Sequence, residues 1–239
     1  LVAGVNAASR VLGREEFILG RDEAYIGVLI DDLVTKGTKE PYRMFTSRAE
    51  HRLVLREDNN LERLHEKAKT YGLLSEDHIA RAETILMQRT QLISTLDKTK
   101  ISPTQKCLDQ LKALGTKPIN KQVSLSDLLK RSEICIKDLR SFDESIAEDE
   151  FILGPVEIRV KYRGYIDRQN EFIRQSKKME NMKINPEIDY FKILGLSREE
   201  MEKLDKLRPA TIAQAQRISG VNPSAIQAIL MYSLREVGK

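Results

Sequence analysis

The chain has 239 residues, which suits one or two domains with a proper core, and its 41% hydrophobic but only 5% aromatic composition favours packed helices over a β-sandwich. A net charge of +4 permits an anionic partner without requiring one. Cys107 and Cys135 form no metal-binding spacing with the three histidines, and no apolar run is long enough to span a membrane. We therefore expect reduced cysteines, no metal, no membrane partner and a cytoplasmic location.

The first half of the sequence predicts a series of helices. Each has an apolar stripe, and most have a capping residue or a terminal glycine: residues 1–12, 22–37, 61–72, 75–96 and 102–115. Pro41 interrupts the pattern after the second of them. Ser75 and the pair Ser102-Pro103 are predicted to begin the last two. Asp31 and Asp32 point about 100° apart on a helix, so we interpret them as a solvated pair and not as an acid/base dyad.

The second half continues the helical pattern after a polar interruption. Residues 116–150 become acidic towards their end, so we expect only short helices there and interpret them as a connection between helical units. A long helix is predicted from Pro155, with a heptad-like stripe and a basic, solvated opposite side. The stripe consists of Ile158, Tyr162, Tyr165, Gln169, Phe172, Ser176 and Met179. A compact helical unit is expected over the last fifty residues, with a capping box at Ser197 and Glu200 and with Asn222-Pro223 as the N-cap and first residue of the last helix.

Residues 40–58, EPYRMFTSRAEHRLVLRED, contain four arginines and no lysine. Arg48, Arg52 and Arg56 are four positions apart, which places them on one face of either a helix or a strand, and the sequence leaves both open. Guanidinium groups bind phosphate or carboxylate through paired hydrogen bonds. The anion is either a nucleic-acid backbone, with an aromatic residue such as Tyr42 stacking on a base, or an acidic residue of the same segment. Those acidic residues are Glu40, Glu50, Glu57 and Asp58.

Residues 212–236 resemble a helix-turn-helix, with two helices around a turn at Gly220. The second helix offers a single cation, Arg235, so we disfavour a DNA reader. Its apolar stripe suits either the local core or the surface of a partner protein, and the sequence leaves both open. The stripe comprises Ile226, Ile229, Leu230, Leu234 and Val237.

Phosphate-cradling loops need closely spaced glycines, and no two of the twelve glycines here are closer than seven positions. Neither a dinucleotide-binding fingerprint nor a P-loop is predicted. No Ser/His/Asp or Cys/His set stands out either. We therefore expect no catalytic residue and no cofactor ligand in this chain.

Several stretches closely resemble the MnmG (GidA) family of flavoproteins, which modify the wobble uridine of tRNA. They are residues 24–59, 164–169 and 207–226 and the opening AGVNAA. The resemblance implies the carboxyl-terminal part of a homodimeric enzyme that works with the GTPase MnmE. It implies addition of an aminomethyl or carboxymethylaminomethyl group to C5 of uridine 34, with FAD, NADH and methylenetetrahydrofolate. His51 departs from the family motif, which usually reads SRAEYR.

The resemblance also implies an organisation. Residues 1–58 would be the end of the FAD-binding domain, a short α/β remnant that carries the arginine-rich segment. Residues 59–150 and 151–239 would be helical domains, so the expected fold is mainly α, a helical bundle with a small carboxyl-terminal helical unit. This part alone would be non-catalytic and without a cofactor. The alternative is a helix-turn-helix nucleic-acid-binding module, or a pure protein-interaction module.

Two sets of site residues follow from the resemblance. Arg43, Arg48, Arg52 and Arg56, with Tyr42, would bind tRNA. Ile226, Ile229, Leu230 and Leu234 would contact the GTPase.

Overall fold

The computed structural model describes residues 1–35, 37, 40–146, 149–180 and 182–237, and the side chains of residues 176, 179, 180 and 234–237 also lie outside this description. The described part is mainly helical, as predicted, with one two-stranded sheet. It divides into two compact units, Leu1–Ile18 with Leu53–Asp167 and Leu19–Arg52 with Arg168–Lys239. These limits differ from the expected boundaries at 58 and 150. No described helix combines the length and apolarity needed to cross a membrane.

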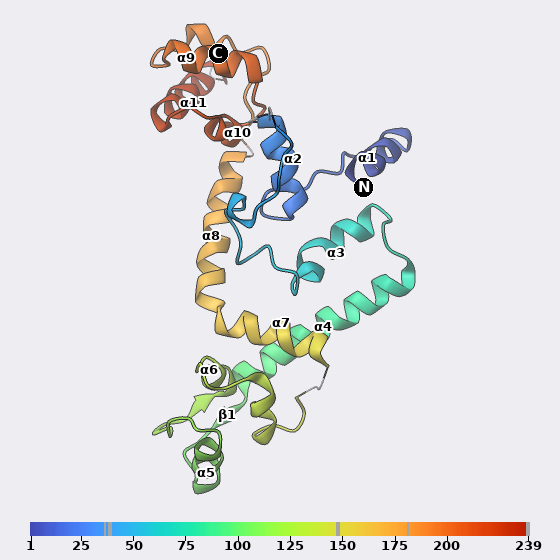
Figure 1. Ribbon diagram of the computed structural model, residues 1–239, viewed down its shortest axis with the longest axis vertical. Coiled ribbons are helices and arrows are strands. Elements are labelled where there is room, and N and C mark those ends of the chain that lie inside the picture. Colours follow the sequence, from blue (N-terminus) through green and yellow to red (C-terminus); the bar gives the residue numbers. More distant parts are fainter. Residues whose placement is uncertain (36, 38–39, 147–148, 181, 238–239) are drawn as a thin grey trace. The chain divides into compact units, whose positions relative to one another are not determined.

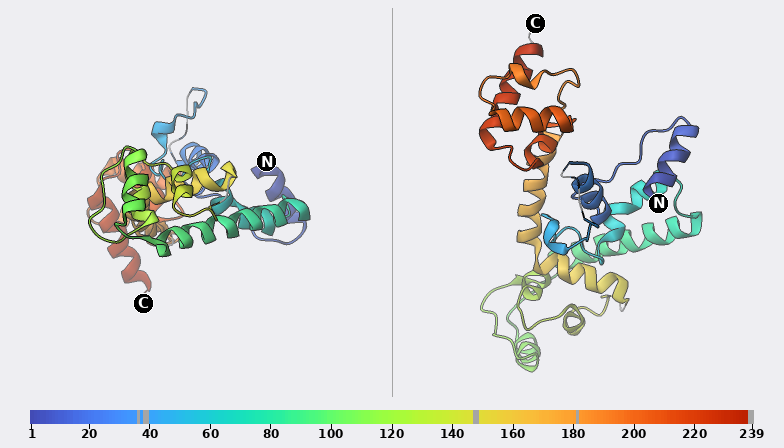
Figure 2. Two further views of the ribbon diagram at one scale, coloured as in Figure 1. Left: turned by 90° about the horizontal axis from the view of Figure 1, so that it is seen from below. Right: turned by 45° about the horizontal axis from the view of Figure 1, so that its top comes forward.

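In the first unit, α4 (Glu76–Lys98) packs mainly against α7 (Glu150–Lys161) and α6 (Leu125–Leu129) (Figures 1 and 2). Ser75 caps α4 as predicted, because its side chain accepts the amide of His78. The buried Arg89 guanidinium of α4 donates to the carbonyl of Phe151 at 2.9 Å and to Glu62 at 2.7 Å. Arg89 therefore ties α4 both to α7 and to α3 (Asn60–Thr70).

The amino-terminal segment is fixed to the first unit through α3. Asn6, on α1 (Val2–Val11), exchanges two hydrogen bonds with the backbone of Phe17, at 3.0 and 2.7 Å. The Phe17 ring meets the ring of Tyr71 edge-on at 4.9 Å. Gly72 ends the α3 turn with a φ of +67°, a conformation that favours glycine.

The core of the first unit is built largely from the segment that the sequence indicated was a polar connection. Within residues 116–150, the fully buried side chains are Leu125, Leu128, Leu129, Ile134 and Leu139. Four of them are presented by α6, which Ser124 caps, and by the 3₁₀ helix η2 (Ile136–Ser141), and Ile134 lies in the loop between the two. The interpretation as a connection was wrong, because most of the described apolar residues of this segment are buried in the core of the first unit.

A two-stranded sheet and one further helix complete the first unit beyond the carboxyl-terminal end of α4. Strand β1 (Lys100–Ile101) pairs antiparallel with β2 (Val123–Ser124), and α5 (Gln105–Ala113) lies between them in sequence. Thr104, and not the predicted Ser102, is the N-cap of α5, since its side chain accepts the amide of Cys107. Cys107 and Leu111 turn inward to the core.

The long helix predicted from Pro155 is in fact two helices, α7, which contains Pro155, and α8 (Arg163–Glu180). The predicted stripe is out of register. The buried apolar side chains of the two helices include Val156, Val160, Ile166 and Ile173, whereas Tyr162, Tyr165 and Phe172 are 47%, 58% and 59% exposed. Branched aliphatic side chains take the core positions, and the tyrosines keep their hydroxyls near solvent.

The second unit contains α2 (Tyr25–Thr35) and three helices near the carboxyl end, α9 (Arg198–Leu207), α10 (Ile212–Arg217) and α11 (Pro223–Val237). The predicted caps are confirmed. Ser197 and Glu200 form a capping box on α9, and the Asn222 side chain accepts the amide of Ala225 at 3.0 Å. The core of this region includes Tyr190, Leu204, Ile212 and Ile229, all at most 1% exposed.

Candidate functional site

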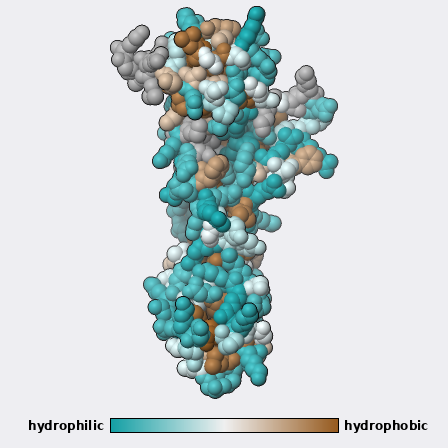
Figure 3. All heavy atoms as spheres, turned by 90° about the vertical axis from the view of Figure 1, so that its left-hand side faces the viewer, coloured by the Kyte–Doolittle hydropathy of each residue, from teal (hydrophilic) through white to brown (hydrophobic). Residues whose placement is uncertain are grey.

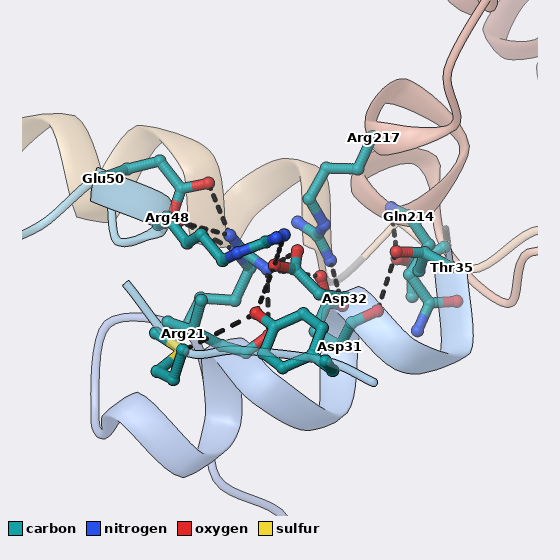
Figure 4. Close-up of polar contacts among 12 residues, drawn as sticks. Arg21, Asp31, Asp32, Thr35, Arg48, Glu50, Gln214 and Arg217 are labelled. Atoms are coloured by element: carbon teal, nitrogen blue, oxygen red, sulfur yellow. Dashed lines mark hydrogen bonds and ion pairs between the residues drawn. The ribbon is translucent and has the colours of Figure 1, made fainter. Parts of the chain in front are cut away.

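A buried arginine organises the arginine-rich segment in the second unit. Arg21 precedes α2, and its guanidinium donates to Asp32 at 2.8 Å and to Asp31 at 3.0 Å on that helix. It also donates to Glu50 at 2.7 Å and to the carbonyl of Arg48 at 3.1 Å. One guanidinium therefore fixes the backbone of residues 48–50 against α2 (Figure 4).

Two further side chains bind the same aspartates. The Tyr42 hydroxyl donates to Asp32 at 2.8 Å, and Arg217 of α10 donates to Asp31 at 2.8 Å. The Arg48 guanidinium lies over the Tyr42 ring, 4.5 Å from its centroid, with one nitrogen 3.8 Å from Asp32. We call Arg21, Asp31, Asp32, Tyr42, Glu50 and Arg217 the anchor cluster (Figure 4).

The surroundings of Arg21, Tyr42 and Glu50 shift the pKa of each of these side chains. Burial alone would lower the pKa of Arg21, but hydrogen bonds to Glu50 and Asp32 outweigh it and raise that pKa above its ordinary value. Burial raises the pKa of Tyr42, and so does its hydrogen bond to Asp32. Burial opposes ionisation of Glu50, yet the bond from Arg21 lowers the pKa of this carboxyl. Arg21 and Glu50 are therefore stabilised in their charged forms, and Tyr42 in its neutral, hydrogen-bond-donating form.

The arginine-rich segment is neither the helix nor the strand that the spacing allowed. Residues 41–57 are irregular apart from the 3₁₀ turn η1 (Thr46–Arg48). In addition, the four arginines are divided between the two compact units. Arg56 belongs to the first unit, whereas Arg43, Arg48 and Arg52 belong to the second. The expected row of stacked guanidiniums was therefore wrong, because contacts to the anchor cluster override the local periodicity.

The four arginines have different surroundings. Arg56 donates to both oxygens of Asp58, at 2.9 and 3.1 Å, and is 18% exposed. Arg48 stacks on Tyr42 and is 39% exposed. Arg43 is exposed and lies over the Phe45 ring at 5.1 Å. Arg52 is exposed, and within the described parts of the chain no acidic group pairs with Arg43 or Arg52.

The internal acids satisfy this segment only in part. Asp58 neutralises Arg56, so for this arginine the anion is an acidic residue of the same segment. Glu50 instead binds Arg21, which lies outside the segment. Arg21 and Arg217 were missed by sequence reasoning, although the adjacent acids of α2 were a signal. Asp32 is 2% exposed, so the interpretation of Asp31 and Asp32 as a solvated pair was wrong.

His51, where the family motif has tyrosine, is turned inward. It is 8% exposed, and its ring lies 6.0 Å from the ring of Phe172 on α8. It lines a pocket of about 310 Å³ together with Glu50, Lys177 and other residues of the second unit. The ring at this position is therefore a packing element next to the anchor cluster and not an exposed stacking surface.

The apolar residues predicted to bind a partner protein are mostly core. Ile226 and Ile229 are 4% and 0% exposed, so the structure places them inside the carboxyl-terminal region. Leu230 is half-buried against the same core, and the Leu234 side chain lies outside the described residues. We therefore correct the expectation for Ile226 and Ile229, whose burial leaves no surface for a partner.

Other apolar side chains of this region do reach the surface (Figure 3). Leu194 is 90% exposed and Met231, on α11, is 61% exposed. Gly195 follows Leu194 and adopts a φ of +98°, and a Cβ on it would lie 3.6 Å from the Cβ of Ala228. Since Ala228 precedes Met231 by about one helical turn, the backbone at Gly195, next to Leu194, lies against α11 about one turn from Met231.

Two family models match the chain. Residues 76–170 match the tRNA modifying enzyme MnmG/GidA C-terminal helical domain, and residues 172–238 match the MnmG/GidA C-terminal helical bundle.

Among the described residues, no group of three or more His, Cys, Asp or Glu side chains could hold a metal ion.

Individual relatives agree with these matches. A Bdellovibrio bacteriovorus protein named tRNA uridine 5-carboxymethylaminomethyl modification enzyme MnmG is 49% identical over 232 residues, which cover 97% of this chain and 36% of that protein. A Geobacillus kaustophilus protein of the same name is 46% identical and is covered to 37%. The crystal form II structure of Aquifex aeolicus GidA superposes with a TM-score of 0.79 at 39% identity, over 96% of this chain and 36% of that one.

The chain therefore spans little more than a third of the relatives it matches. Within that third the agreement runs nearly from end to end, and the two family models follow one another with a single residue between them. The chain belongs to the MnmG/GidA family and corresponds to the carboxyl-terminal region of its members.

Proposed function

We propose that this chain is the carboxyl-terminal part of an FAD-dependent enzyme that adds a carboxymethylaminomethyl or aminomethyl group to C5 of the wobble uridine of tRNA. The names of the relatives support the reaction and the substrate. In this proposal the whole protein is a homodimer that works with a GTPase in the cytoplasm. The part described here binds tRNA and the GTPase, and it is not itself catalytic.

The observation that carries tRNA binding is the combination of an anchored backbone with two unneutralised guanidiniums. Arg52 comes two positions after Glu50, which Arg21 holds, and directly after the buried His51. Arg43 comes directly after Tyr42, whose hydroxyl is held by Asp32. Binding phosphate therefore requires little ordering of the backbone at either position, and less conformational entropy is lost.

The remaining arginines have different roles in this proposal. Arg48 already faces Asp32 and Tyr42, so it contributes to an RNA contact only with its exposed edge. Arg56 is engaged by Asp58 and the carbonyl of Leu53, so its role is structural. Tyr42 is also engaged, with its ring under Arg48, and it orients the segment instead of stacking on a base.

The chain lacks the glycine spacing that binds the phosphates of the flavin cofactor of the family. A flavin phosphate cradle needs closely spaced glycines, and those of this chain are at least seven positions apart. The described residues therefore do not form a binding site for the phosphates of FAD.

The test measures tRNA affinity of the complete protein that contains this chain, over a series of salt concentrations. Arg43→Gln with Arg52→Gln should weaken binding and lower the slope of log K against log salt by about one to two. Arg56→Gln is the matched control, because Asp58 already neutralises that guanidinium. An unchanged affinity and slope in the double variant would refute the proposed contact.

A second role, docking of the partner GTPase, is favoured by the surface around α11. Large exposed apolar patches on soluble proteins mark surfaces that bind a partner. Leu194 and Met231 replace the buried Ile226 and Ile229 as the residues expected to contact the partner. They are 90% and 61% exposed, so a substitution there leaves the core intact.

Docking is tested with Leu194→Asp and Met231→Asp. Each should reduce association with the GTPase at least tenfold, since a charge would be buried at an apolar contact. Circular dichroism should be unchanged in both. Ile229→Asp is the contrasting variant and should unfold the region, because Ile229 is fully buried. Normal association of both surface variants would rule out this face.

A further inference from the structure

The positive charge of the chain is concentrated in one segment that the sequence patterns did not single out. Residues 98–121 contain six lysines and one acidic residue, Asp109, a net charge of +5. The whole chain carries +4, so the remainder is slightly negative. The arginine-rich segment 40–58 has four arginines and four acidic residues and is therefore neutral overall. The excess of cations lies with the lysines.

These lysines lie on one lobe of the first unit, formed by α5, the two-stranded sheet and the end of α4 (Figures 1 and 2). Cys107 and Leu111 turn inward from α5, which leaves its other face to solvent. All six lysines are exposed: Lys98, Lys100, Lys106, Lys112, Lys117 and Lys121. We call them the lysine lobe.

The lysine lobe is not neutralised by its own acids. Asp109, the one acidic residue of the segment, accepts a hydrogen bond from the side-chain amide of Gln105 at 2.9 Å. Across the described residues, none of the six lysines forms an ion pair, whereas other lysines of the same unit do. Lys130, for example, lies 2.8 Å from Asp127.

The nearby acids are held by other groups. Asp97 accepts from Arg163 at 3.1 Å through both of its oxygens, and Glu133 accepts from Thr116 at 2.7 Å. Asp138 accepts the amide of Cys135 at 2.7 Å. With these acids engaged elsewhere, the six ammonium groups repel one another unless an external polyanion lies among them.

We propose that the lysine lobe is a second RNA-binding surface, which contacts the phosphate backbone of the tRNA without reading its sequence. This inference rests on the proposed function, since the tRNA is the polyanion concerned. Lysine ammoniums act as mobile point charges and suit a sequence-independent contact, whereas guanidiniums held on an anchored backbone suit a fixed one. The lysine lobe would increase the affinity for tRNA, and the arginine-rich segment would fix the position of the bound tRNA.

The test uses the complete protein, a fluorescently labelled tRNA and a series of salt concentrations. In the test variant, Lys106, Lys112, Lys117 and Lys121 are each replaced by glutamine. Affinity should fall on the order of tenfold or more, and the slope of log K against log salt should decrease by about two or more. A companion variant with arginine at the same four positions keeps the charge and should bind like the unmodified protein.

The matched control replaces four paired lysines of the same unit by glutamine, and so removes the same formal charge. They are Lys69, Lys130, Lys137 and Lys161, whose partners are Glu83, Asp127, Glu150 and Glu157. The control should lose clearly less affinity. Equal losses in both variants would show that only total charge matters and would overturn the lysine lobe, as would unchanged binding of the test variant.

Failure of this inference is distinguishable from failure of the proposed function. If the unmodified protein does not bind tRNA, both fall. If it binds, and the variant of Arg43 and Arg52 is weakened while the lysine variant is not, only the lysine lobe is refuted. The reverse result would refute the arginine contact and support the lobe.

Discussion

The Arg21 guanidinium lies 2.8 Å from Asp32, and the two side chains are 6% and 2% exposed. This buried ion pair has additional hydrogen bonds from Tyr42 to the aspartate and from Arg21 to Glu50. A buried charge is tolerated only when it is paired and hydrogen-bonded in this way. The exposed arginines of the segment therefore depend on an arginine that never reaches the surface.

Replacing Arg21 by glutamine should destabilise the second unit by about 3–5 kcal/mol, because Asp32 would remain buried without its cation. Hydrogen exchange of peptides from α2 would measure the change. Arg198→Gln is the control, since Arg198 is 91% exposed and pairs with Glu202 on the surface. If both variants exchange alike, Arg21 does not anchor the segment.

Gly27 allows α2 to approach the loop that carries Arg21. A Cβ on Gly27 would overlap the carbonyl oxygen of Gly20 and lie 2.5 Å from that of Leu19. Gly27→Ala should therefore displace the loop and lower the thermal midpoint of the second unit. Gly154→Ala, on α7, meets nothing within 4 Å and should stabilise its helix by up to about 1 kcal/mol. A neutral effect at Gly27 would contradict this close packing.

The caps and most helices could be predicted from sequence because they depend on neighbouring residues. Ser75, Ser197 and Asn222 cap the helices that their positions indicated. The anchor cluster could not be predicted, because Arg21 meets Glu50 across 29 positions and Arg217 meets Asp31 across 186. Tertiary contacts of this kind also hold the arginine-rich segment in an irregular conformation. The periodicity of the sequence predicts neither the anchor cluster nor this conformation.

Residues 116–150 show a second limit of sequence reasoning, and a core variant tests the correction. Leu129, on α6, is 0% exposed in the core of the first unit. Leu129→Ala should cost about 2–5 kcal/mol of stability, measured by urea denaturation of the first unit. Met87→Ala is the comparison, because Met87 is 62% exposed and its removal leaves no cavity. A loss no larger than that of Met87→Ala would restore the interpretation as a connection.

Glu200 should make the carboxyl-terminal region sensitive to acid. Burial alone would raise its pKa, but hydrogen bonds from Ser197 and from the amide of Asn222 lower it below the ordinary 4.5. A lowered pKa means that Glu200 stabilises the fold above pH 4.5 and that this contribution is lost as the pH falls through the folded-state value. Protonation would make the Glu200 carboxyl a weaker acceptor for the backbone amides of Ser197 and Asn222 and would release the turn before α11.

Hydrogen exchange of peptides from α9, followed from neutral to acidic pH, would measure this dependence. Glu200→Gln should be less stable than the unmodified chain at neutral pH and should lose less stability on acidification, because glutamine keeps an acceptor oxygen but cannot titrate. Glu202→Gln, on the exposed side of α9, should leave the acid dependence unchanged, since Glu202 is 59% exposed. If the variant at Glu200 retains the full acid dependence of the unmodified chain, a different carboxyl is responsible for it.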